Sequence, residues 1–134
     1  MVNLSKSKYC ALWQCPKMLW LRKYKPELAE VDSHTLSIME TGNAVGDLAM
    51  GLFGDFTEVT VYTDGEIDLS AMVRRTQEEI KKDTSVICEA SFEWNGLYCA
   101  VDILRREGDG WSIYEVKSST SDDKAAVSYT HLTL

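Results

Sequence analysis

The alternation of apolar and polar residues is clearest in the last third of the chain. Three stretches, over 86–94, 97–106 and 111–118, place apolar, aromatic and β-branched side chains at alternating positions, which predicts β-strands. An Asn-Gly dipeptide at 95–96 is a strong hairpin signal, because both residues tolerate the positive φ angles of a tight turn. A second short turn over 107–110 follows. The pattern therefore predicts an antiparallel meander of three strands.

The sequence ahead of this meander predicts mainly helices. Ser5 is a suitable N-cap, and Pro16 suits the first turn of a following helix because it has no amide hydrogen to leave unbonded. The expected elements are helices over 5–14, 16–24, 33–53 and 69–82, with a strand over 57–62. We therefore predict an α/β (α+β) fold in which N-terminal helices pack on a mixed sheet that contains the meander.

The two predicted turns determine which residues of the meander lie opposite each other. A two-residue loop at 95–96 places Glu89 opposite Asp102, and a loop centred between 108 and 109 places Asp102 opposite Glu115. Lys117 shares their face because side chains alternate along a strand. The other face is expected to form the core, with Cys88, Ala90, Phe92, Trp94, Leu97, Cys99, Val101 and Ile103.

A row of three carboxylates across neighbouring strands has a chemical consequence. Like charges directly opposite one another repel, so the row needs a cation, a shifted pKa or full solvation. Hard divalent ions such as Mg²⁺ and Mn²⁺ prefer oxygen ligands, and Lys117 beside them could orient a nucleophile or stabilise phosphate charge. The alternative is an ordinary solvent-facing surface. A one-residue bulge would remove Glu89 from the row.

The composition narrows the class of protein. The 134 residues suffice for one domain with a hydrophobic core, and no apolar run approaches the ~20 residues of a membrane span. The N-terminus lacks the apolar stretch of a secretory signal, so we expect a cytoplasmic protein without membrane contact. Four cysteines without a C-x-x-C pair give no complete zinc knuckle, and reduced thiols are expected.

Charge is distributed unevenly along the chain. The net charge is −7, yet residues 1–26 hold six bases and no acids, whereas the remainder holds 8 bases and 21 acids. The basic segment also contains four aromatic residues, Tyr9, Trp13, Trp20 and Tyr24. It could contact a phosphate backbone and stack on bases. Alternatively, it forms a solvated helix pair whose aromatic side chains enter the core.

Several short segments together resemble a known nuclease family. The predicted meander contains Val-Asp-Ile-Leu at 101–104 and Tyr-Glu-Val-Lys-Ser-Ser at 114–119, and the upstream segments are 4–7, 14–21 and 42–46. The first two resemble the signature of the PD-(D/E)xK nuclease superfamily, and the upstream segments are similar to its RecB-like and CRISPR-adaptation-type members. The resemblance extends to about residue 121. It implies a restriction-endonuclease-like core and metal-dependent hydrolysis of DNA.

The resemblance also implies roles for individual residues. Asp102 and Glu115 would bind Mg²⁺ or Mn²⁺ together with the carbonyl of Val116, and Lys117 would help to position the attacking water. Glu89 is a further candidate ligand, on the register argument alone. Three basic residues are the candidates for contacting DNA: Lys17, Arg22 and Lys23. Cys15 matches one ligand of the four-cysteine iron–sulfur cluster of some relatives, which could form only in a full-length protein.

The chain also departs from the family pattern. Gly46 stands where relatives often have a metal-binding histidine, the three later cluster cysteines are absent, and the Gln…Tyr helix after the lysine is missing. Residues 127–134 resemble read-through of sequencing-adapter DNA, which predicts a non-native tail on a C-terminally incomplete single domain, 1–126. Such a fragment could be inactive and could self-associate through exposed sheet. The full protein would have additional domains or a helicase-type partner.

Three functional hypotheses follow. The first is a metal-dependent DNA nuclease domain of the RecB-like type. The second is a nucleic-acid-binding module that keeps the fold without turnover and contacts DNA through the basic N-terminal helices. The third is a small α+β interaction domain whose acidic row is only a surface.

Overall fold

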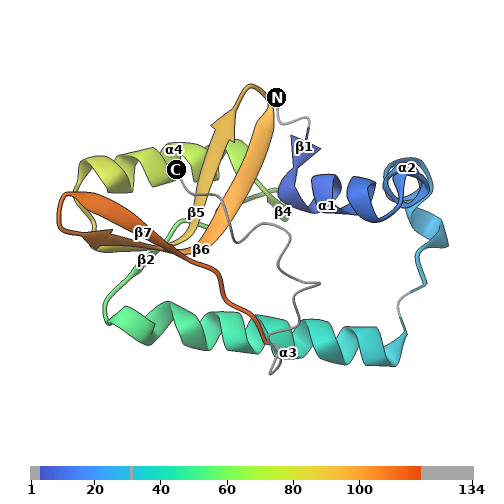
Figure 1. Ribbon diagram of the computed structural model, residues 1–134, viewed down its shortest axis with the longest axis horizontal. Helices are drawn as coiled ribbons and strands as arrows, with labels where there is room; N and C mark the ends of the chain where they lie inside the picture. Colours follow the sequence, from blue (N-terminus) through green and yellow to red (C-terminus); the bar gives the residue numbers. More distant parts are fainter. Residues whose placement is uncertain (1–3, 31, 119–134) are drawn as a thin grey trace.

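The computed structural model describes residues 4–30 and 32–118, and it has the predicted mixture of helices and strands (Figure 1). The first half is mainly helical: β1 (Leu4–Ser5), α1 (Lys6–Gln14), α2 (Pro16–Tyr24), η1 (Pro26–Leu28), α3 (Ser33–Met50) and η2 (Gly51–Phe53). The second half contains β2 (Thr57–Glu58), β3 (Tyr62–Thr63), β4 (Glu66–Ile67), α4 (Leu69–Lys81), β5 (Val86–Trp94), β6 (Leu97–Glu107) and β7 (Gly110–Tyr114). The predicted tail lies outside the described residues.

The helices begin where capping groups occur in the sequence. The Ser5 hydroxyl accepts a hydrogen bond from the Lys8 amide at 3.3 Å, as the N-cap prediction requires. Aspartates cap the two longer helices in the same way, Asp32 at the start of α3 and Asp68 at the start of α4. These caps satisfy amide groups that have no partner within their helix.

The sheet is mixed, as predicted. Strands β2, β5 and β6 lie side by side, with β2 parallel to β5 and β5 antiparallel to β6. Both β1 and β7 pair with the outer edge of β6, β1 near its beginning and β7 near its end. The strand expected over 57–62 is wrong as one element: it divides into β2 and β3, and β3 forms a separate hairpin with β4.

The predicted registers of the meander are confirmed where the strands pair. Cys88↔Ile103 and Ala90↔Val101 have the predicted register and bracket Glu89 and Asp102, which are not themselves a backbone pair. Strand β7 keeps its predicted register with β6 but ends at Tyr114, so the expected strand over 111–118 is too long. Glu115 and Lys117 therefore follow the strand rather than belonging to it.

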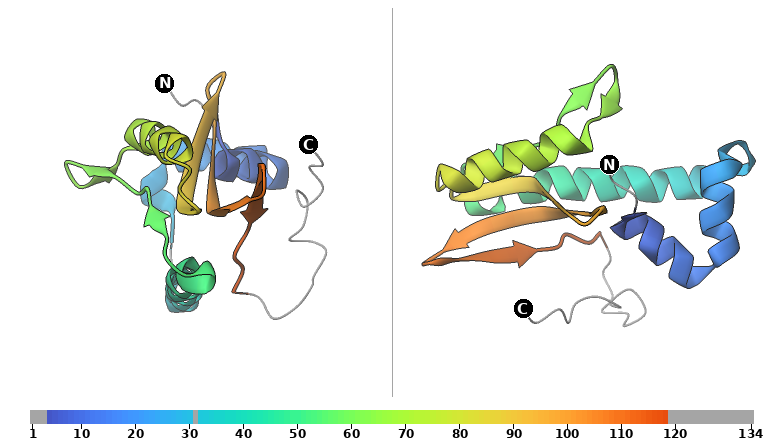
Figure 2. Two further views of the ribbon diagram at one scale, coloured as in Figure 1. Left: turned by 90° about the vertical axis from the view of Figure 1, so that its left-hand side faces the viewer. Right: turned by 90° about the horizontal axis from the view of Figure 1, so that it is seen from above.

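The sheet separates two apolar clusters. One contains Ile87, Ala90, Val101 and Leu104 and receives Ile80 of α4. The other consists of Val86, Cys88 and Ile103, and partly buried residues of the α3–η2 end pack against it. Figure 2 shows α4 and α3 on different sides of the strands. One face of the sheet is thus covered by α4, and the other is covered only where the C-terminal end of α3 and η2 pack on it.

The single apolar face predicted for the meander is wrong. Cys88 and Ala90 belong to different clusters although strict alternation would place them on one face, and the same is true of Ile103 and Val101. Both strands therefore change faces at Glu89 and Asp102. Near the hairpin tip, three residues of the predicted core are exposed: Trp94, Leu97 and Cys99.

The N-terminal arm, comprising β1, α1 and α2, packs little against the rest of the chain. Ala11 is the one buried residue of α1, and α2 has none. All four aromatic residues of the arm are about half or more exposed, with Trp13 reaching 73%. The alternative in which these side chains enter the core is therefore wrong. Within the described residues, no helix is both long enough and apolar enough to cross a membrane.

Candidate active site

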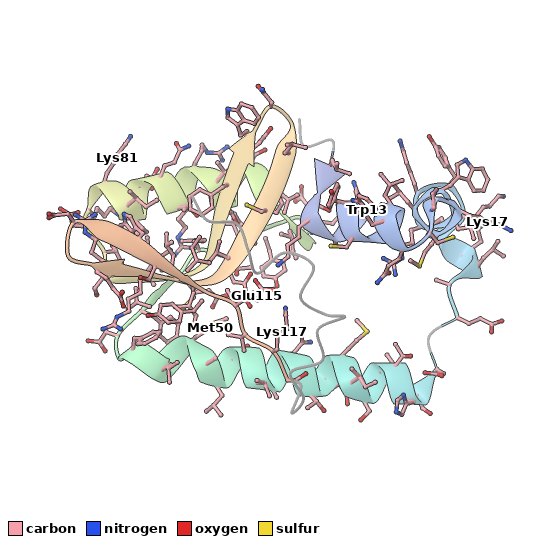
Figure 3. All side chains as sticks on the ribbon, viewed as in Figure 1. Trp13, Lys17, Met50, Lys81, Glu115 and Lys117 are labelled. Atoms are coloured by element: carbon pink, nitrogen blue, oxygen red, sulfur yellow. The ribbon has the colours of Figure 1, made fainter. Side chains whose placement is uncertain are left out.

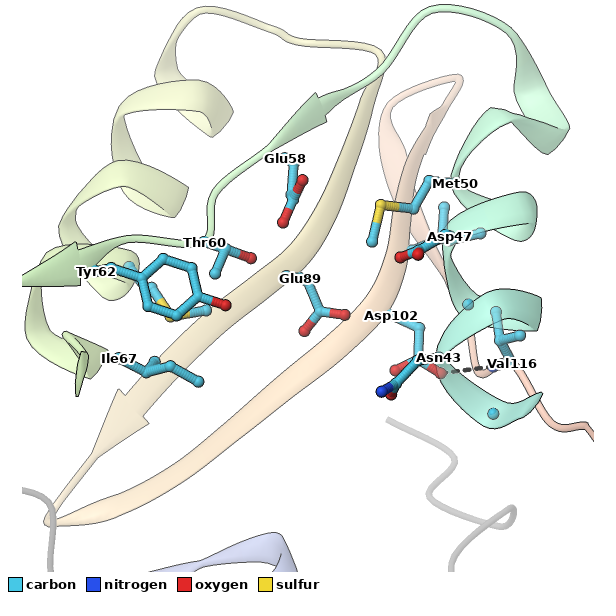
Figure 4. A pocket seen from close by; sticks show the side chains of 14 residues that line it. Asn43, Asp47, Met50, Glu58, Thr60, Tyr62, Ile67, Glu89, Asp102 and Val116 are labelled. Atoms are coloured by element: carbon cyan, nitrogen blue, oxygen red, sulfur yellow. Dashed lines mark hydrogen bonds between the residues drawn. The ribbon is translucent and has the colours of Figure 1, made fainter. Parts of the chain in front are cut away.

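A cleft of about 570 Å³ lies between α3, the β2–β4 region and the centre of the sheet. Figure 4 shows Glu58, Glu89 and Asp102 directed into this space from β2, β5 and β6, with Asp47 entering from α3. The remaining lining residues are Gly42, Asn43, Gly46, Met50, Thr60, Tyr62, Ile67, Met72, Ile103 and Val116. Four carboxyl groups and no basic side chain line the cleft, so its electrostatic potential favours a cation.

Asp102 lies at the point where the chain after β7 separates from β6. The last paired residues are Ile103 and Tyr114, and beyond them the Val116 amide donates a hydrogen bond to Asp102 Oδ2 at 2.6 Å. The carboxylate of Asp102 thus accepts a hydrogen bond from the chain after β7, at the point where the backbone pairing of β6 with β7 has ended. Asp102 Oδ1 forms no hydrogen bond with any described residue. The carboxylate is consequently oriented through one oxygen and has the other available.

Glu89 has a backbone conformation that is rare within a strand. Its φ angle is +58°, whereas the other non-glycine positive φ angles of the described residues occur in turns, at Asp64, Asp83 and Asn95. Such a conformation costs on the order of 1–3 kcal/mol and persists where the surrounding structure enforces it. Here it coincides with the change of faces, which directs Glu89 into the cleft beside Asp102.

The surroundings of Glu89 disfavour its charged form. Burial raises the pKa of its carboxyl group, and the charges of Asp102, Glu58 and Glu115 raise it further. Its carboxylate forms neither a hydrogen bond nor an ion pair with the described residues. A bound cation would relieve this repulsion.

Glu115 lies beside the cleft and does not line it. Its Oε1 accepts hydrogen bonds from Lys6 Nζ at 2.8 Å and from Lys117 Nζ at 2.5 Å, while Oε2 forms none within the described structure. Burial raises the pKa of Glu115, but the hydrogen bonds and positive charges of Lys117 and Lys6 outweigh that effect and lower it overall. Glu115 is therefore held as a carboxylate.

The donor atoms fit a hard divalent ion in their chemistry. Among residues 4–30 and 32–118, no group of three or more His, Cys, Asp or Glu side chains is arranged to hold a metal ion. Asp102 and Glu115 nevertheless each have one oxygen without a hydrogen bond, and Glu89 has two. Mg²⁺ and Mn²⁺ use such oxygen ligands, and Mg²⁺ commonly keeps several waters beside one or two carboxylates.

Two acidic residues of the cleft were missed by the sequence reasoning. Asp47 follows Gly46, the position at which the nuclease resemblance leads one to expect histidine, so this segment carried a usable signal. Glu58 reaches the cleft because β2 pairs with β5 through Glu58↔Cys88. No local pattern predicts that parallel pairing.

The other predicted site residues lie on the N-terminal arm. Cys15 is an exposed free thiol between α1 and α2. Lys17, Arg22 and Lys23 all belong to α2, where Lys23 Nζ lies 5.0 Å from the ring centroid of Tyr24. Figure 3 shows Lys17 extending away from the sheet. These three basic residues are therefore separated from the acidic cleft and form part of a different, solvent-facing surface.

The remaining cysteines do not join Cys15 in a metal site within the described structure. Cys88 is fully buried, and burial raises the pKa of its thiol to about 11. Cys10 is partly buried in α1, and Cys99 is an exposed free thiol on β6. Cys88 is therefore buried, as its predicted place on the core face requires, whereas Cys99 is not.

Comparison of the chain with protein-family models, with curated proteins and with solved structures gives no match.

Proposed function

We propose that this chain is a metal-dependent nuclease domain of the RecB-like type, with a restriction-endonuclease-like core, which hydrolyses DNA phosphodiester bonds. One observation carries the proposal. Asp102 and Glu115 are each fixed through one carboxylate oxygen and have the other without a hydrogen bond, at the edge of a cleft that Glu89 also enters. Carboxylates held in this way are suited to an ion that binds them through oxygen.

The charge pattern around these residues supports the proposal. The cleft contains four carboxyl groups, whereas Lys6 and Lys117 lie next to it on Glu115. A metal-dependent phosphodiester hydrolase needs oxygen ligands for the cation and, next to them, positively charged groups that can bind the phosphate. A purely structural acidic surface does not require a strained Glu89 or two lysines on a single carboxylate oxygen.

Each residue would have a definite task. Asp102 and Glu115 would hold Mg²⁺ or Mn²⁺ together with the carbonyl of Val116, and Glu89 is a further candidate ligand. The ion would supply Lewis acidity and lower the pKa of bound water. The Val116 amide keeps Asp102 oriented. The flexible side chain of Lys117 ends in an ammonium group with three N–H donors. It would orient the attacking water and stabilise negative charge that develops on the phosphate.

The proposal can be tested first without DNA. Calorimetric titration with Mn²⁺ should give saturable binding, and Asp102→Asn should weaken it roughly tenfold or more, because the site loses a charged ligand. Asp109→Asn is a matched control, since Asp109 lies in the exposed β6–β7 turn. If the folded parent chain does not bind Mn²⁺, or if both variants bind it as the parent does, the proposal is wrong.

Cleavage of DNA provides the second test. Lys117→Ala should lower the rate roughly 10²–10³-fold while Mn²⁺ binding is retained, because the lysine acts on water and phosphate rather than on the ion. Loss of Mn²⁺ binding in Lys117→Ala would contradict this role and would indicate that the lysine only holds Glu115 in place.

A second candidate function is a nucleic-acid-binding module without turnover. The exposed aromatic residues of the N-terminal arm favour it, because they accompany six bases and no acids over residues 1–26. DNA binding that survives Asp102→Asn but is lost when Lys17 and Arg22 are both replaced by Gln would support it. Indifference to both DNA and divalent ions would favour an interaction domain instead.

A further inference from the structure

A contact between the two ends of the described chain connects the N-terminal arm to the candidate active site. Lys6, in the first turn of α1, is 109 residues from Glu115, yet its Nζ lies 2.8 Å from Glu115 Oε1. The pairing of β1 with β6 at Leu4↔Leu97 and Ser5↔Tyr98 holds this turn against the sheet. The position of Lys6 beside the cleft is therefore a consequence of the fold.

The atoms involved indicate more than a structural ion pair. Lys6 and Lys117 both contact Glu115 Oε1, so two ammonium groups share one oxygen. The side chains of Lys6 and Lys117 are 37% and 51% exposed, which allows either to reach an anion that arrives from solvent.

A cation bound to Oε2 of Glu115 would weaken the attraction between this carboxylate and the two lysines. Three positive groups would then surround a single carboxylate, and their mutual repulsion would favour movement of a lysine to a different anion. Lys117 follows Glu115 by two residues and is tethered near it, whereas Lys6 belongs to a separate helix. An anionic phosphate next to the cleft would offer Lys6 such a partner.

We propose that Lys6 is a second phosphate-binding lysine of this site, which exchanges Glu115 for a phosphodiester oxygen of the bound nucleic acid. This inference rests on the proposed nuclease function and adds a substrate-binding residue from the N-terminal arm. It also gives a role to the contact between the basic segment 1–26 and the acidic rest of the chain, which meet where Lys6 bonds to Glu115. The arm would bring the polyanion to the edge of a cleft that would otherwise repel it.

The test measures binding of a short fluorescent DNA duplex by the whole chain at a fixed concentration of Ca²⁺, which takes oxygen ligands and is used in place of Mg²⁺ or Mn²⁺ to limit turnover. Affinity is followed by anisotropy between about 50 and 200 mM salt, because each phosphate contact adds about 0.9 to the slope of log K against log[salt]. Lys6→Gln should reduce that slope by about 0.9, and Lys6→Arg, which keeps the charge, should retain it. Thermal melts establish that the variants are folded.

Lys82→Gln is the matched control. Lys82 also forms an ion pair with a glutamate, Glu79, at 2.7 Å, but it follows α4 and lies away from the cleft. A slope that falls equally in Lys6→Gln and Lys82→Gln, or in neither, would overturn the proposal. So would an unchanged slope in Lys6→Gln accompanied by loss of Mn²⁺ binding, because Lys6 would then serve only to hold Glu115.

The outcomes separate this inference from the proposed function. If Lys6→Gln lowers the salt slope but the parent chain neither binds Mn²⁺ nor cleaves DNA, the phosphate contact stands and the nuclease proposal fails. If the parent chain cleaves DNA and the slope is unchanged in Lys6→Gln, the nuclease proposal stands and the role of Lys6 is refuted.

Discussion

The two long helices of this protein are used in different ways. Helix α4 has 13 residues and buries Met72 and Thr76 against the sheet, whereas α3 has 18 residues and buries none. Only the C-terminal end of α3, with Ala49 and Met50, packs on the apolar cluster around Cys88. Thus α4 stabilises the fold through its buried side chains, whereas α3 contributes to stability only at its C-terminal end.

The side of α3 that does not pack on the sheet borders the cleft. Gly42, Asn43, Gly46 and Asp47 all line it, and a Cβ added at either glycine would meet nothing within 4 Å. The comparison shows that the cleft exists because α3 stands off from the sheet where α4 does not. Variants in both helices can test this division.

The largest difference is expected from apolar truncation. Met72→Ala in α4 should lower the free energy of unfolding by about 2–5 kcal/mol, because Met72 is 4% exposed and its loss leaves a cavity. Leu48→Ala in α3 should change it by less than about 0.5 kcal/mol, because Leu48 is 82% exposed. Urea denaturation of both variants measures the contrast. Equal losses would show that α3 packs as tightly as α4.

A smaller loss of stability is expected from replacing a threonine, because Thr76 of α4 is buried whereas Thr41 of α3 is exposed. The Thr76 hydroxyl donates to the Met72 carbonyl and accepts from the Ser91 amide at 2.8 Å in the buried interface of α4 and β5. Thr76→Val preserves the shape but leaves a buried amide without a partner, which should cost about 1–3 kcal/mol. Thr41→Val in α3 is the control, because its hydroxyl bonds to the Ser37 carbonyl at an exposed position.

Hydrogen exchange would sharpen that comparison. In Thr76→Val, the Ser91 amide should exchange faster than in the parent, because its acceptor has been removed. The Thr41→Val variant should leave this amide unaffected. Unaltered protection of Ser91 in Thr76→Val would mean that another acceptor replaces the hydroxyl.

The smallest effect concerns Glu89, in the cleft that α3 leaves open. Because the folded-state pKa of Glu89 is raised by burial and by Asp102 and Glu58, the folded chain binds this proton more tightly than the unfolded chain does. Below the ordinary value of 4.5 both states are protonated and no stability is lost. As pH rises from 4.5 through the folded-state pKa, the stability contributed by this group falls.

Glu89→Gln should therefore increase the free energy of unfolding at neutral pH and flatten its dependence on pH between 4.5 and 7. Denaturant titrations across this range measure the change, with Glu78→Gln on the exposed side of α4 as the control. The same substitution should weaken Mn²⁺ binding if Glu89 is a ligand. Greater stability without weaker Mn²⁺ binding would exclude that role.

Local sequence signals predicted the elements well because their causes are local. Proline at 16, the Ser5 cap and the Asn-Gly turn act within a few residues, and the helices and hairpins that they predict are present. The pairing across the meander also followed, since a tight turn determines the register of the strands that it joins.

The sequence by itself thus determined the helices, the order of the meander strands and the register on either side of Glu89 and Asp102. Only the tertiary structure decided that both strands change faces at those two residues, that Asp47 and Glu58 join them in the cleft, and that Lys6 contacts Glu115. The physical reason is that alternation describes an undistorted strand, whereas these features arise from contacts between segments far apart in the chain. Periodicity along the sequence contains no information about such contacts.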